Sequence, residues 1–344
     1  MRVVSLFAGI GGFDLGFTQA GMEVVAHVER DMKCRKLLAA KFPDAAMLDD
    51  VCTAGFGNLP DCDVLAGGWP CQDLSQAGKR AGLAGARSGL FYEYARIAYE
   101  LQPTFLVWEN VPGLLTSDDG RDMLRVVMEL QRIGYRGGWR TIDAQFLGVA
   151  QRRRRVFGVF TRIDSGAARC AEILSLQEGV RGHPAPRREA REEIAGTIGG
   201  SSQSGGFRTT DLDNSGAFVV GTLTQGAHPG SYNGQDAYTG QLVPVAFSCK
   251  DYGGDCGEMS PTLRAMGHLH SHMNGGGQVA IASGLAVRRL TPLEWERLQG
   301  FPDGWTEGFS DSTRYKMLGN AIAVLVARWI ASRMMNLAYP KSPK

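Results

Sequence analysis

The first 160 residues alternate between short apolar runs, which are typical of buried strands, and longer stretches in which apolar positions recur with helical spacing. We expect strands at residues 2–7, 23–29, 63–68, 104–110 and 154–160, and helices at residues 13–20, 33–42, 90–101 and 122–134. This alternation predicts a doubly wound, mostly parallel α/β sheet. Ligands of such a sheet bind beyond the carboxyl ends of its strands, so we expect functional side chains directly after the strands.

The regular pattern is lost at residues 165–284, where glycine, serine, asparagine and threonine dominate. A weak threefold repeat runs through this stretch as AGTIGG, then VGTLTQG leading to GQLVPVAF, then SPTLRAMG leading to GGGQVAIA. The repeat predicts short strands joined by long loops, although a disordered linker has a similar composition. We therefore expect a small, irregular, β-rich domain inserted into the α/β domain.

Helical spacing returns in residues 285–344. Thr291 and Pro292 in LTPLEWERLQGF predict the capped start of a helix, and AIAVLVARWIASRMM after Asn320 predicts an apolar helix. These residues would complete the α/β domain that residues 1–164 begin. A chain of 344 residues is long enough for one large domain with a smaller domain inserted.

The composition is that of a soluble globular protein, with 44% apolar and 21% charged residues. No apolar run approaches the length of a membrane span, and the N-terminus lacks the cleavage site of a signal peptide, so we expect a cytoplasmic protein. Seven cysteines at scattered spacings argue against a disulfide framework. The formal net charge of +2 neither requires nor excludes a nucleic-acid partner.

One stretch of the insert is rich in metal-ligating residue types, namely Cys249, Cys256, His268, His270 and His272. Their spacing does not match a compact zinc-ligand pattern. Histidines that are exposed or that face a bound partner explain the stretch better, so we expect no metal site.

Three groups at the ends of the first strands are candidates for binding a cofactor. FAGIGG, from Phe7 to Gly12, lies between a strand and a helix, and its glycines would let a cofactor approach the backbone. Glu29 ends the second strand, where an acid commonly accepts ribose hydroxyls. Asp50 and Val51 end the next segment and could contact an adenine. A tight turn without a ligand would also explain the glycines, and a helix cap would explain Asp50.

Three further groups carry candidate reaction chemistry. In GGWPCQDLSQAG, Cys71 follows a strand in a glycine-bounded loop, where a thiolate is accessible. Glu109 ends the next strand in the apolar context VWENV, so its carboxyl group should be partly desolvated and able to hold or donate a proton. Gln151, Arg153 and Arg155 in GVAQRRRRVFGV alternate as they enter a strand and therefore share one face. Taken alone, Cys71 would be an inert thiol and the arginines a solvated cluster.

Together and in this order, the segments resemble the motifs of the DNA (cytosine-5)-methyltransferases of bacteria and phages. FAGIGG resembles the cofactor motif of that family, GGWPCQDLSQAG its nucleophile loop, VWENV its glutamate motif and QRRRRVF its Gln-x-Arg-x-Arg motif. RRLTPLEWERLQGFPD is similar to a late helix motif, and LGNAI to the final cofactor motif. The resemblance covers about residues 1–160 and 286–330, and the insert stands where the family has its target-recognition domain.

The resemblance implies a Rossmann-like, S-adenosyl-L-methionine-dependent methyltransferase fold and a reaction at carbon 5 of cytosine. After the target cytosine is flipped out of duplex DNA, Cys71 would attack carbon 6 and activate carbon 5 toward the methyl group of the cofactor. Glu109 would relieve charge at ring nitrogen 3. Arg153 resembles the arginine that contacts the base carbonyl, and Arg155 the one that orders the nucleophile loop.

The same resemblance implies which residues hold the two substrates. For S-adenosyl-L-methionine these are Phe7, Ala8, Gly9, Gly11, Gly12, Glu29, Arg30, Asp50, Val51, Gly68, Pro70, Leu90, Asn320 and Ala321. For double-stranded DNA they are Pro70, Gln72, Ser75, Asn110, Val111 and Gln151. We expect a monomer that acts in restriction–modification or in phage or prophage DNA protection, with any cognate restriction endonuclease acting separately.

Three alternative functions fit part of the sequence. Methyltransferases that act on cytosines of transfer RNA share the catalytic motifs, but their small domains are usually compact, whereas this insert is long and polar. A catalytically silent DNA-binding regulator would not need Cys71, Glu109 and Arg153. A nicotinamide-dependent oxidoreductase accounts for the first βαβ unit only.

Overall fold

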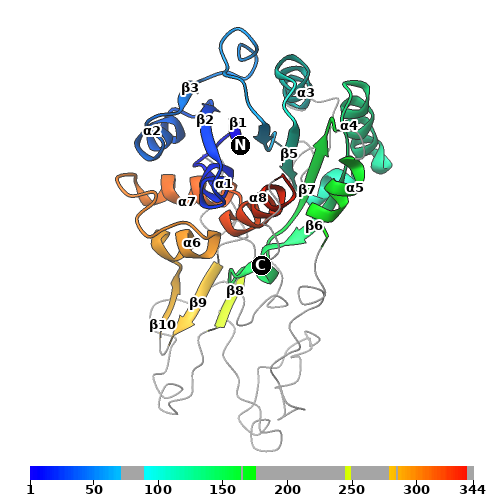
Figure 1. Cartoon of the computed structure of the whole chain (residues 1–344). Coiled ribbons are helices and arrows are strands. Elements are labelled where there is room, and N and C mark those ends of the chain that lie inside the picture. The colour runs from blue at the N-terminus through cyan, green and yellow to red at the C-terminus, as the bar shows by residue number, and fades with distance from the viewer. Residues whose placement is uncertain (71–88, 164–165, 176–244, 249–278, 284–285, 339–344) are drawn as a thin grey trace, which may run out of the picture. The chain divides into compact units, whose positions relative to one another are not determined.

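The computed structural model describes residues 1–70, 89–163, 166–175, 245–248, 279–283 and 286–338 (Figure 1). This part is built on a seven-stranded sheet with the order β3-β2-β1-β4-β5-β7-β6. The strands are β1 (Arg2–Leu6), β2 (Glu23–Val28), β3 (Ala46–Leu48), β4 (Val64–Gly67), β5 (Phe105–Asn110), β6 (Arg136–Asp143) and β7 (Arg154–Thr161). β1 to β5 pair in parallel, whereas β7 runs antiparallel to β5 and β6. The prediction of a mostly parallel α/β sheet is confirmed.

The strand order reverses between β1 and β4, because the chain first places β2 and β3 on one side of β1 and then β4 and β5 on the other. The carboxyl ends of β1 and β4 flank this switch point, where ligands of open α/β sheets bind. The segments that follow β1, β2, β4 and β5 all start at this edge of the sheet.

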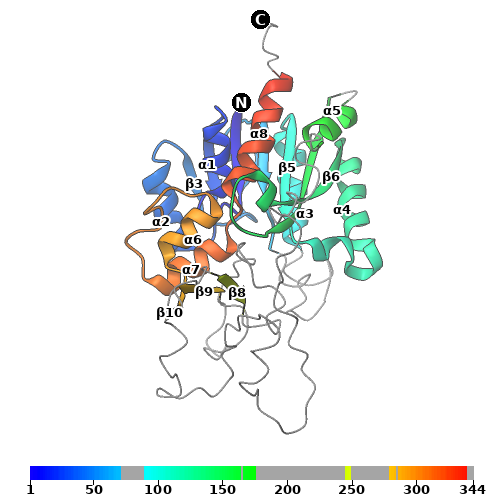
Figure 2. The same ribbon diagram turned by 90° about the horizontal axis from the view of Figure 1, so that it is seen from below.

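Helices cover both faces of the sheet (Figures 1 and 2). They are α1 (Gly12–Gln19), α2 (Met32–Lys41), α3 (Leu90–Leu101), α4 (Arg121–Arg132), α5 (Gly166–Ile173), α6 (Pro292–Gln299), α7 (Asp311–Asn320) and α8 (Val324–Ala338), with 3-10 turns at Pro112–Leu115, Ser117–Gly120 and Ala144–Leu147. Neighbouring residues of a strand point to opposite faces of the sheet. On one face, Leu65 and Trp108 pack with α3 and α4. On the other face, Val64 and Val107 pack with α1, α5 and α8. Burial on both faces explains why these strands are continuous apolar runs.

Helices α1 and α8 lie side by side on one face, and two glycines of α1 set their distance. A Cβ atom at Gly16 would lie 2.7 Å from the Cβ atom of Ala327 and 2.7 Å from the amide nitrogen of Arg328. A Cβ atom at Gly12 would overlap Ile322, which lies just before α8. The C-terminal part of the chain is thereby held against the loop that follows β1.

α6 begins as predicted, with a capping box. The Thr291 hydroxyl accepts a hydrogen bond from the Glu294 amide (3.3 Å), and the Glu294 carboxylate accepts one from the Thr291 amide (2.7 Å). The predicted apolar helix starts later than expected, because Asn320 is the last residue of α7 and α8 begins at Val324.

The loop after α6 is organised by Glu296, whose side chain is fully buried. Its carboxylate accepts hydrogen bonds from the amides of Gly304 and Thr306 (2.8 Å each) and from the Arg314 guanidinium (3.0 Å). Burial opposes ionisation of this carboxyl group, but the hydrogen bonds outweigh that effect and hold the pKa of Glu296 below its usual value. Glu296 is thus an ionised, fully bonded anchor for this loop.

A second, three-stranded antiparallel sheet has the order β10-β9-β8. Its strands are β8 (Val245–Ser248), β9 (Val279–Ser283) and β10 (Ala286–Arg289). β8 and β9 coincide with two of the β-rich runs that the sequence repeat predicts, whereas AGTIGG lies outside the described residues. Within the part of the chain that the structure describes, no helix is long and apolar enough to cross a bilayer.

Candidate active site

The loop after β1 has a backbone conformation that favours glycine. Gly9 and Gly11 have φ angles of 58° and 84°, and Phe7 also has a positive φ angle of 54°, which is rare for a bulky residue. The Gly11 amide donates to the Ala8 carbonyl (2.9 Å), and Gly12 then starts α1. Among the described residues, nothing lies within 4 Å of the place that a Cβ atom at Gly9 would take. The described part of the chain therefore leaves the backbone of this loop accessible to a ligand.

Glu29 holds this loop against the end of β2. Its carboxylate accepts hydrogen bonds from the amides of Gly9 and Asp31, both at 2.7 Å. Burial raises the pKa of the Glu29 carboxyl group, against the effect of these two hydrogen bonds. Arg30 is exposed beside it, and the Arg30 carbonyl accepts a hydrogen bond from the Arg35 guanidinium (2.8 Å). The free lone pairs of Glu29 are thus well placed to accept ligand hydroxyls.

Asp50 and Val51 start a turn shortly after β3. The Asp50 carboxylate accepts a hydrogen bond from the Cys52 amide (2.9 Å), which lowers the pKa of Asp50. The Asp50 carbonyl accepts hydrogen bonds from the amides of Thr53 (3.2 Å) and Ala54 (3.1 Å). Val51 is buried in the hydrophobic cluster that also contains the buried side chains of α3.

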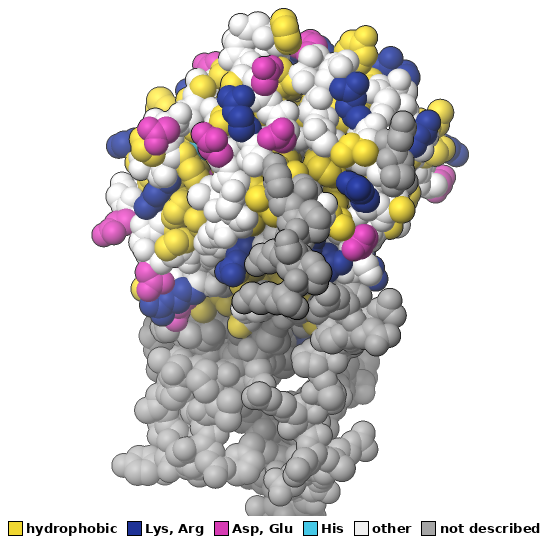
Figure 3. Space-filling view, viewed as in Figure 1, with side chains coloured by type: hydrophobic (Ala, Val, Ile, Leu, Met, Phe, Trp, Pro, Cys, Tyr) yellow, Lys and Arg dark blue, Asp and Glu magenta, His cyan; other side chains and the backbone are white. Residues whose placement is uncertain are grey.

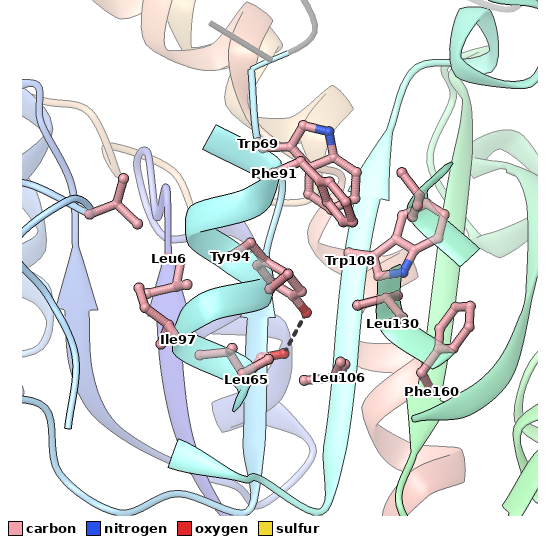
Figure 4. Packing of buried hydrophobic residues seen from close by; sticks show 14 of the residues in the cluster. Leu6, Leu65, Trp69, Phe91, Tyr94, Ile97, Leu106, Trp108, Leu130 and Phe160 are labelled. Carbon is pink, nitrogen blue, oxygen red and sulfur yellow. Dashed lines mark hydrogen bonds between the residues drawn. The ribbon is translucent and has the colours of Figure 1, made fainter. Parts of the chain in front are cut away.

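An aromatic cluster anchors the segment that follows β4 (Figure 4). Trp69 is buried, and its ring centroid lies 4.9 Å from that of Phe91, 5.6 Å from that of Tyr94 and 5.4 Å from that of Trp108. The Tyr94 hydroxyl donates a hydrogen bond to the Leu65 carbonyl (3.1 Å). The end of β4, the end of β5 and the first turns of α3 are therefore packed into one unit.

The segment that carries Cys71, the candidate nucleophile, begins directly after this anchor. Pro70 is exposed, whereas Cys71, Gln72 and Ser75 lie outside the described residues. The chain is described again just before α3, whose first residue, Leu90, is partly buried in the same cluster as Trp69.

Glu109 and Arg155 face each other at adjoining ends of β5 and β7. The Arg155 Nε atom lies 3.0 Å from Glu109 Oε1, and the two side chains keep 16% and 18% of their surfaces exposed. On the other side, a Cβ atom at Gly68 would lie 3.1 Å from Glu109 Oε2. A glycine at this position therefore lets the backbone before Cys71 approach the carboxylate.

Asn110, the last residue of β5, links β5 to the segment that follows β4. It is buried, and its side-chain amide donates a hydrogen bond to the Trp69 carbonyl (3.4 Å). Its side-chain oxygen accepts one from the Val111 amide (2.9 Å), and Val111 is itself partly buried. Asn110 thus fixes the backbone two residues before Cys71.

Burial alternates along the arginine-rich segment as the sequence predicts. Gln151 and Arg153 are buried and Arg155 is partly buried, whereas Arg152 and Arg154 are exposed. Within the described part of the chain, neither polar side-chain atom of Gln151 has a hydrogen-bond partner. The alternating residues therefore share an inward face, and Arg152 and Arg154 lie on the opposite, exposed face.

Arg153 reaches the C-terminal part of the chain. Its guanidinium donates hydrogen bonds to the carbonyls of Ala321 (2.6 Å) and Gly319 (3.4 Å). Asn320 lies between them and is exposed, while Ala321 is buried. The start of β7 is thereby bonded to the segment that follows α7.

The sequence matches the model of the C-5 cytosine-specific DNA methylase family over residues 1–336. The chain belongs to this family. It is a DNA (cytosine-5)-methyltransferase. The groups after β1, β2, β4 and β5 lie at the carboxyl edge of its sheet, where open α/β sheets bind ligands.

Curated relatives of this methyltransferase align with nearly the whole length of this chain. The type II methyltransferase M.NgoPII of Neisseria gonorrhoeae is 30% identical over 96% of this chain and 94% of its own. M.NlaX of Neisseria lactamica is 29% identical over 97% and 96%, respectively. M2.BsuMI of Bacillus subtilis is 29% identical over 99% of this chain and 76% of its own.

Solved structures share the fold. A putative DNA modification methyltransferase encoded within a prophage (E. coli) superposes with a TM-score of 0.60 at 21% identity, covering 98% of this chain and 99% of that one. The Dnmt2 methyltransferase of S. pombe superposes with a TM-score of 0.59 at 17% identity over the same shares of the two chains. At these identities, both likenesses show the fold alone.

The site of this methyltransferase also contains residues that the sequence motifs did not single out. Trp69 precedes Pro70, and its role is visible only once Phe91 and Tyr94 of α3 are packed against it. Arg96, also on α3, bonds the turn after Asp50. An aromatic residue between a strand and a candidate nucleophile could have signalled the first, whereas nothing in the sequence signals the second.

The surface of this methyltransferase shows acidic and basic side chains interspersed on the face seen in Figure 3. Within the part of the chain that is described, no three His, Cys, Asp or Glu side chains gather as a metal site requires. Cys249, Cys256 and the three neighbouring histidines lie outside that part.

Proposed function

We propose that this enzyme flips a target cytosine out of duplex DNA, attacks carbon 6 with Cys71, and methylates carbon 5 from S-adenosyl-L-methionine. The observation that carries the proposal is the ion pair of Glu109 and Arg155. Its carboxylate lies close to Gly68, three residues before Cys71. An acid and a fixed cation beside a nucleophile loop are the groups that covalent activation of a cytosine ring needs.

The residues at the switch point fit S-adenosyl-L-methionine. The open backbone of Gly9 and the turn at Phe7 leave room for a ligand, and the Glu29 carboxylate would accept its ribose hydroxyls. Asp50 and Val51 would line the adenine. When bound, the cofactor supplies a methyl group on a positively charged sulfur.

The other cofactor contacts proposed from the motifs lie around the same edge. Gly68, Pro70 and Leu90 border the nucleophile loop on both sides, and Arg30 follows Glu29. Ala8, Gly11 and Gly12 shape the glycine loop, and Asn320 and Ala321 approach it because Ile322 contacts Gly12.

In the proposed mechanism, the Cys71 thiolate forms a bond to carbon 6, and Glu109 donates a hydrogen bond or proton to ring nitrogen 3. The negative charge that leaves the thiolate is thereby neutralised on the ring, and carbon 5 becomes nucleophilic. Once carbon 5 carries the methyl group, its proton passes to solvent and the bond between carbon 6 and Cys71 breaks, so that Cys71 leaves as a thiolate. Any proton given to ring nitrogen 3 returns to Glu109, and the aromatic ring is restored. Gln72, Ser75, Asn110, Val111 and Gln151 would complete the pocket for the flipped base.

We assign the contact with the base carbonyl to Arg155 rather than to Arg153, the residue to which the motif resemblance gives that contact. Arg155 lies beside Glu109 and is partly exposed, so it can reach a base that Glu109 also contacts. Arg153 is buried and bonded to the carbonyls of Gly319 and Ala321, so we assign to it the coupling of the catalytic strand to the C-terminal segment.

We further propose that residues 165–284 form the target-recognition domain, and that residues 1–164 and 285–344 form the catalytic domain. The length of the insert and its polar character support a DNA-reading role. The enzyme would act as a monomer on DNA in the cytoplasm, within restriction–modification or phage DNA protection. Any cognate restriction endonuclease would be a separate chain.

The test is methyl incorporation from labelled S-adenosyl-L-methionine into duplex DNA and, in parallel, into transfer RNA. We expect label in duplex DNA with the native chain and none with Cys71→Ala. Label in RNA alone, or equal label with both proteins, would overturn the proposal.

A further inference from the structure

The turn that carries Asp50 and Val51 buries the side chains of Val51 and Ala54, and its own backbone hydrogen bonds are local. Apart from the hydrogen bonds to Asp50, its backbone is held by Asn58, whose side chain bonds the Gly55 amide and the Thr53 carbonyl (2.9 Å each). Such a short segment samples other conformations unless a rigid element holds it. What holds it here is α3.

Arg96 of α3 reaches this turn with one end of its guanidinium. The Arg96 Nη2 atom donates hydrogen bonds to the carbonyls of Val51 (3.1 Å) and Ala54 (2.8 Å). Two backbone carbonyls of the turn are therefore bonded to a single side-chain nitrogen. The contact spans more than 40 residues of sequence, so it is a tertiary constraint rather than a local turn interaction.

Two carboxylates accept hydrogen bonds from the other nitrogens of the Arg96 guanidinium. Its Nε atom donates to Glu93 (2.8 Å) and its Nη1 atom to Glu100 (2.7 Å). Glu100 also accepts a hydrogen bond from the Phe56 amide (3.1 Å), and Gly55 lets this carboxylate approach because a Cβ atom there would overlap it. Burial opposes the charge of Arg96, but its bonds to Glu100 and Glu93 outweigh that effect and raise its pKa. A planar fork with fixed donors can make these contacts together, whereas a lysine ammonium cannot.

α3 is itself a rigid support. Phe91, Tyr94, Ile97 and Ala98 are fully buried, and the Tyr94 hydroxyl is bonded to the Leu65 carbonyl of β4. The helix therefore keeps a fixed position on the sheet, and the hydrogen bonds of Arg96 fix the turn relative to the helix.

We propose that Arg96 is a positioning residue for cofactor binding: it holds the Asp50–Val51 turn in its binding conformation before the cofactor arrives. This inference rests on the proposed role of Asp50 and Val51 at the adenine. Without Arg96 the turn adopts its binding conformation for only part of the time, and the apparent affinity falls by that fraction. Arg96 contacts no reacting atom, so turnover at saturating cofactor should be preserved.

The experiment compares Arg96→Met with the matched control Arg132→Met. Arg132 bonds the Glu129 carboxylate through two nitrogens (2.9 and 2.7 Å), on α4, and among the described residues it bonds no turn. Calorimetry with S-adenosylhomocysteine should show about tenfold weaker binding for Arg96→Met and unchanged binding for Arg132→Met. Arg96→Lys should fall between the native chain and Arg96→Met. In turnover, KM for the cofactor should rise in Arg96→Met while kcat stays within about twofold of native.

Hydrogen exchange of the ligand-free proteins gives a second readout that does not depend on activity. The amides of residues 53–59 should exchange faster in Arg96→Met than in the native chain and in Arg132→Met. Equal exchange, or equal affinity in the two methionine variants, would overturn the inference. If the native chain bound no cofactor analogue, the proposed function would fail, and the exchange comparison would still decide whether Arg96 holds the turn.

Discussion

Replacing Gly12 by alanine tests whether the C-terminal segment must pack against the start of α1. A Cβ atom at this position would lie 2.7 Å from the carbonyl oxygen of Ile322 and would overlap the Ile322 side chain. Ordinary contact begins at 3.4 Å, so the carbonyl must retreat by about 0.7 Å. A backbone atom that is tied to α8 cannot do this without moving its neighbours.

Two effects of opposite sign decide the magnitude for Gly12→Ala. Alanine restricts the unfolded chain, which favours folding by about 0.4–1 kcal/mol. Overpacking a dense interface costs about 1–3 kcal/mol. We therefore expect a net loss of about 1–2 kcal/mol in the free energy of unfolding. Because Ala321 precedes Ile322, the displacement should also weaken binding of S-adenosylhomocysteine.

The matched control is Gly138→Ala on the edge strand β6, where a Cβ atom would meet none of the described residues within 4 Å. We expect the free energy of unfolding of Gly138→Ala to exceed that of the native chain by about 0.5–1 kcal/mol, because glycine weakens a strand relative to alanine. Urea unfolding measures both, as a change of midpoint at constant slope. The reasoning is refuted if Gly12→Ala is as stable as the native chain, or if both variants shift in the same direction.

Three further expectations follow from the site and its supports. Glu296→Gln should destabilise the protein fully above about pH 4.5 and progressively less below it, because the stability from the lowered pKa of Glu296 is lost as pH falls from the ordinary value of 4.5 through the lowered pKa. Thermal unfolding at pH values from about 3 to 7 checks this. Trp69→Ala should cost about 3–5 kcal/mol, whereas Trp69→Phe should retain most of the stability in urea unfolding. Arg155→Met should lower kcat by about 10²–10³-fold and leave the DNA affinity unchanged. Single-turnover assays and DNA-binding titrations measure the two effects. Weaker DNA binding with a normal kcat would argue against the proposed contact of Arg155 with the base.

The central sheet could be predicted from the sequence because its strands are buried on both faces and are therefore continuous apolar runs. β6 was missed because its sequence, RGGWRTID, contains two glycines and two arginines, and it forms by pairing with the strongly apolar β7. α7 was missed because DSTRYKMLGN has no apolar period. It is held by tertiary contacts, such as the hydrogen bond from the Tyr315 hydroxyl to the Leu290 carbonyl (2.7 Å).

The candidate site could be predicted only up to the face on which each side chain lies. Strand periodicity places Arg153 and Arg155 on one face, but it does not say what each contacts. That depends on the register of β7 against β5, which brings Arg155 to Glu109, and on where the chain after α7 crosses Arg153. Likewise, the motif around Cys71 reveals nothing of Trp69 or Arg96, because their partners lie on α3 and on the turn after Asp50.

Bisulfite sequencing of DNA from a methylation-free host that expresses this chain tests the central claim most directly. We predict protected cytosines in one or more recurrent sequence contexts with the native chain, and none with Cys71→Ala. Full conversion of all cytosines with the native chain, or the same protection with both proteins, would contradict the account.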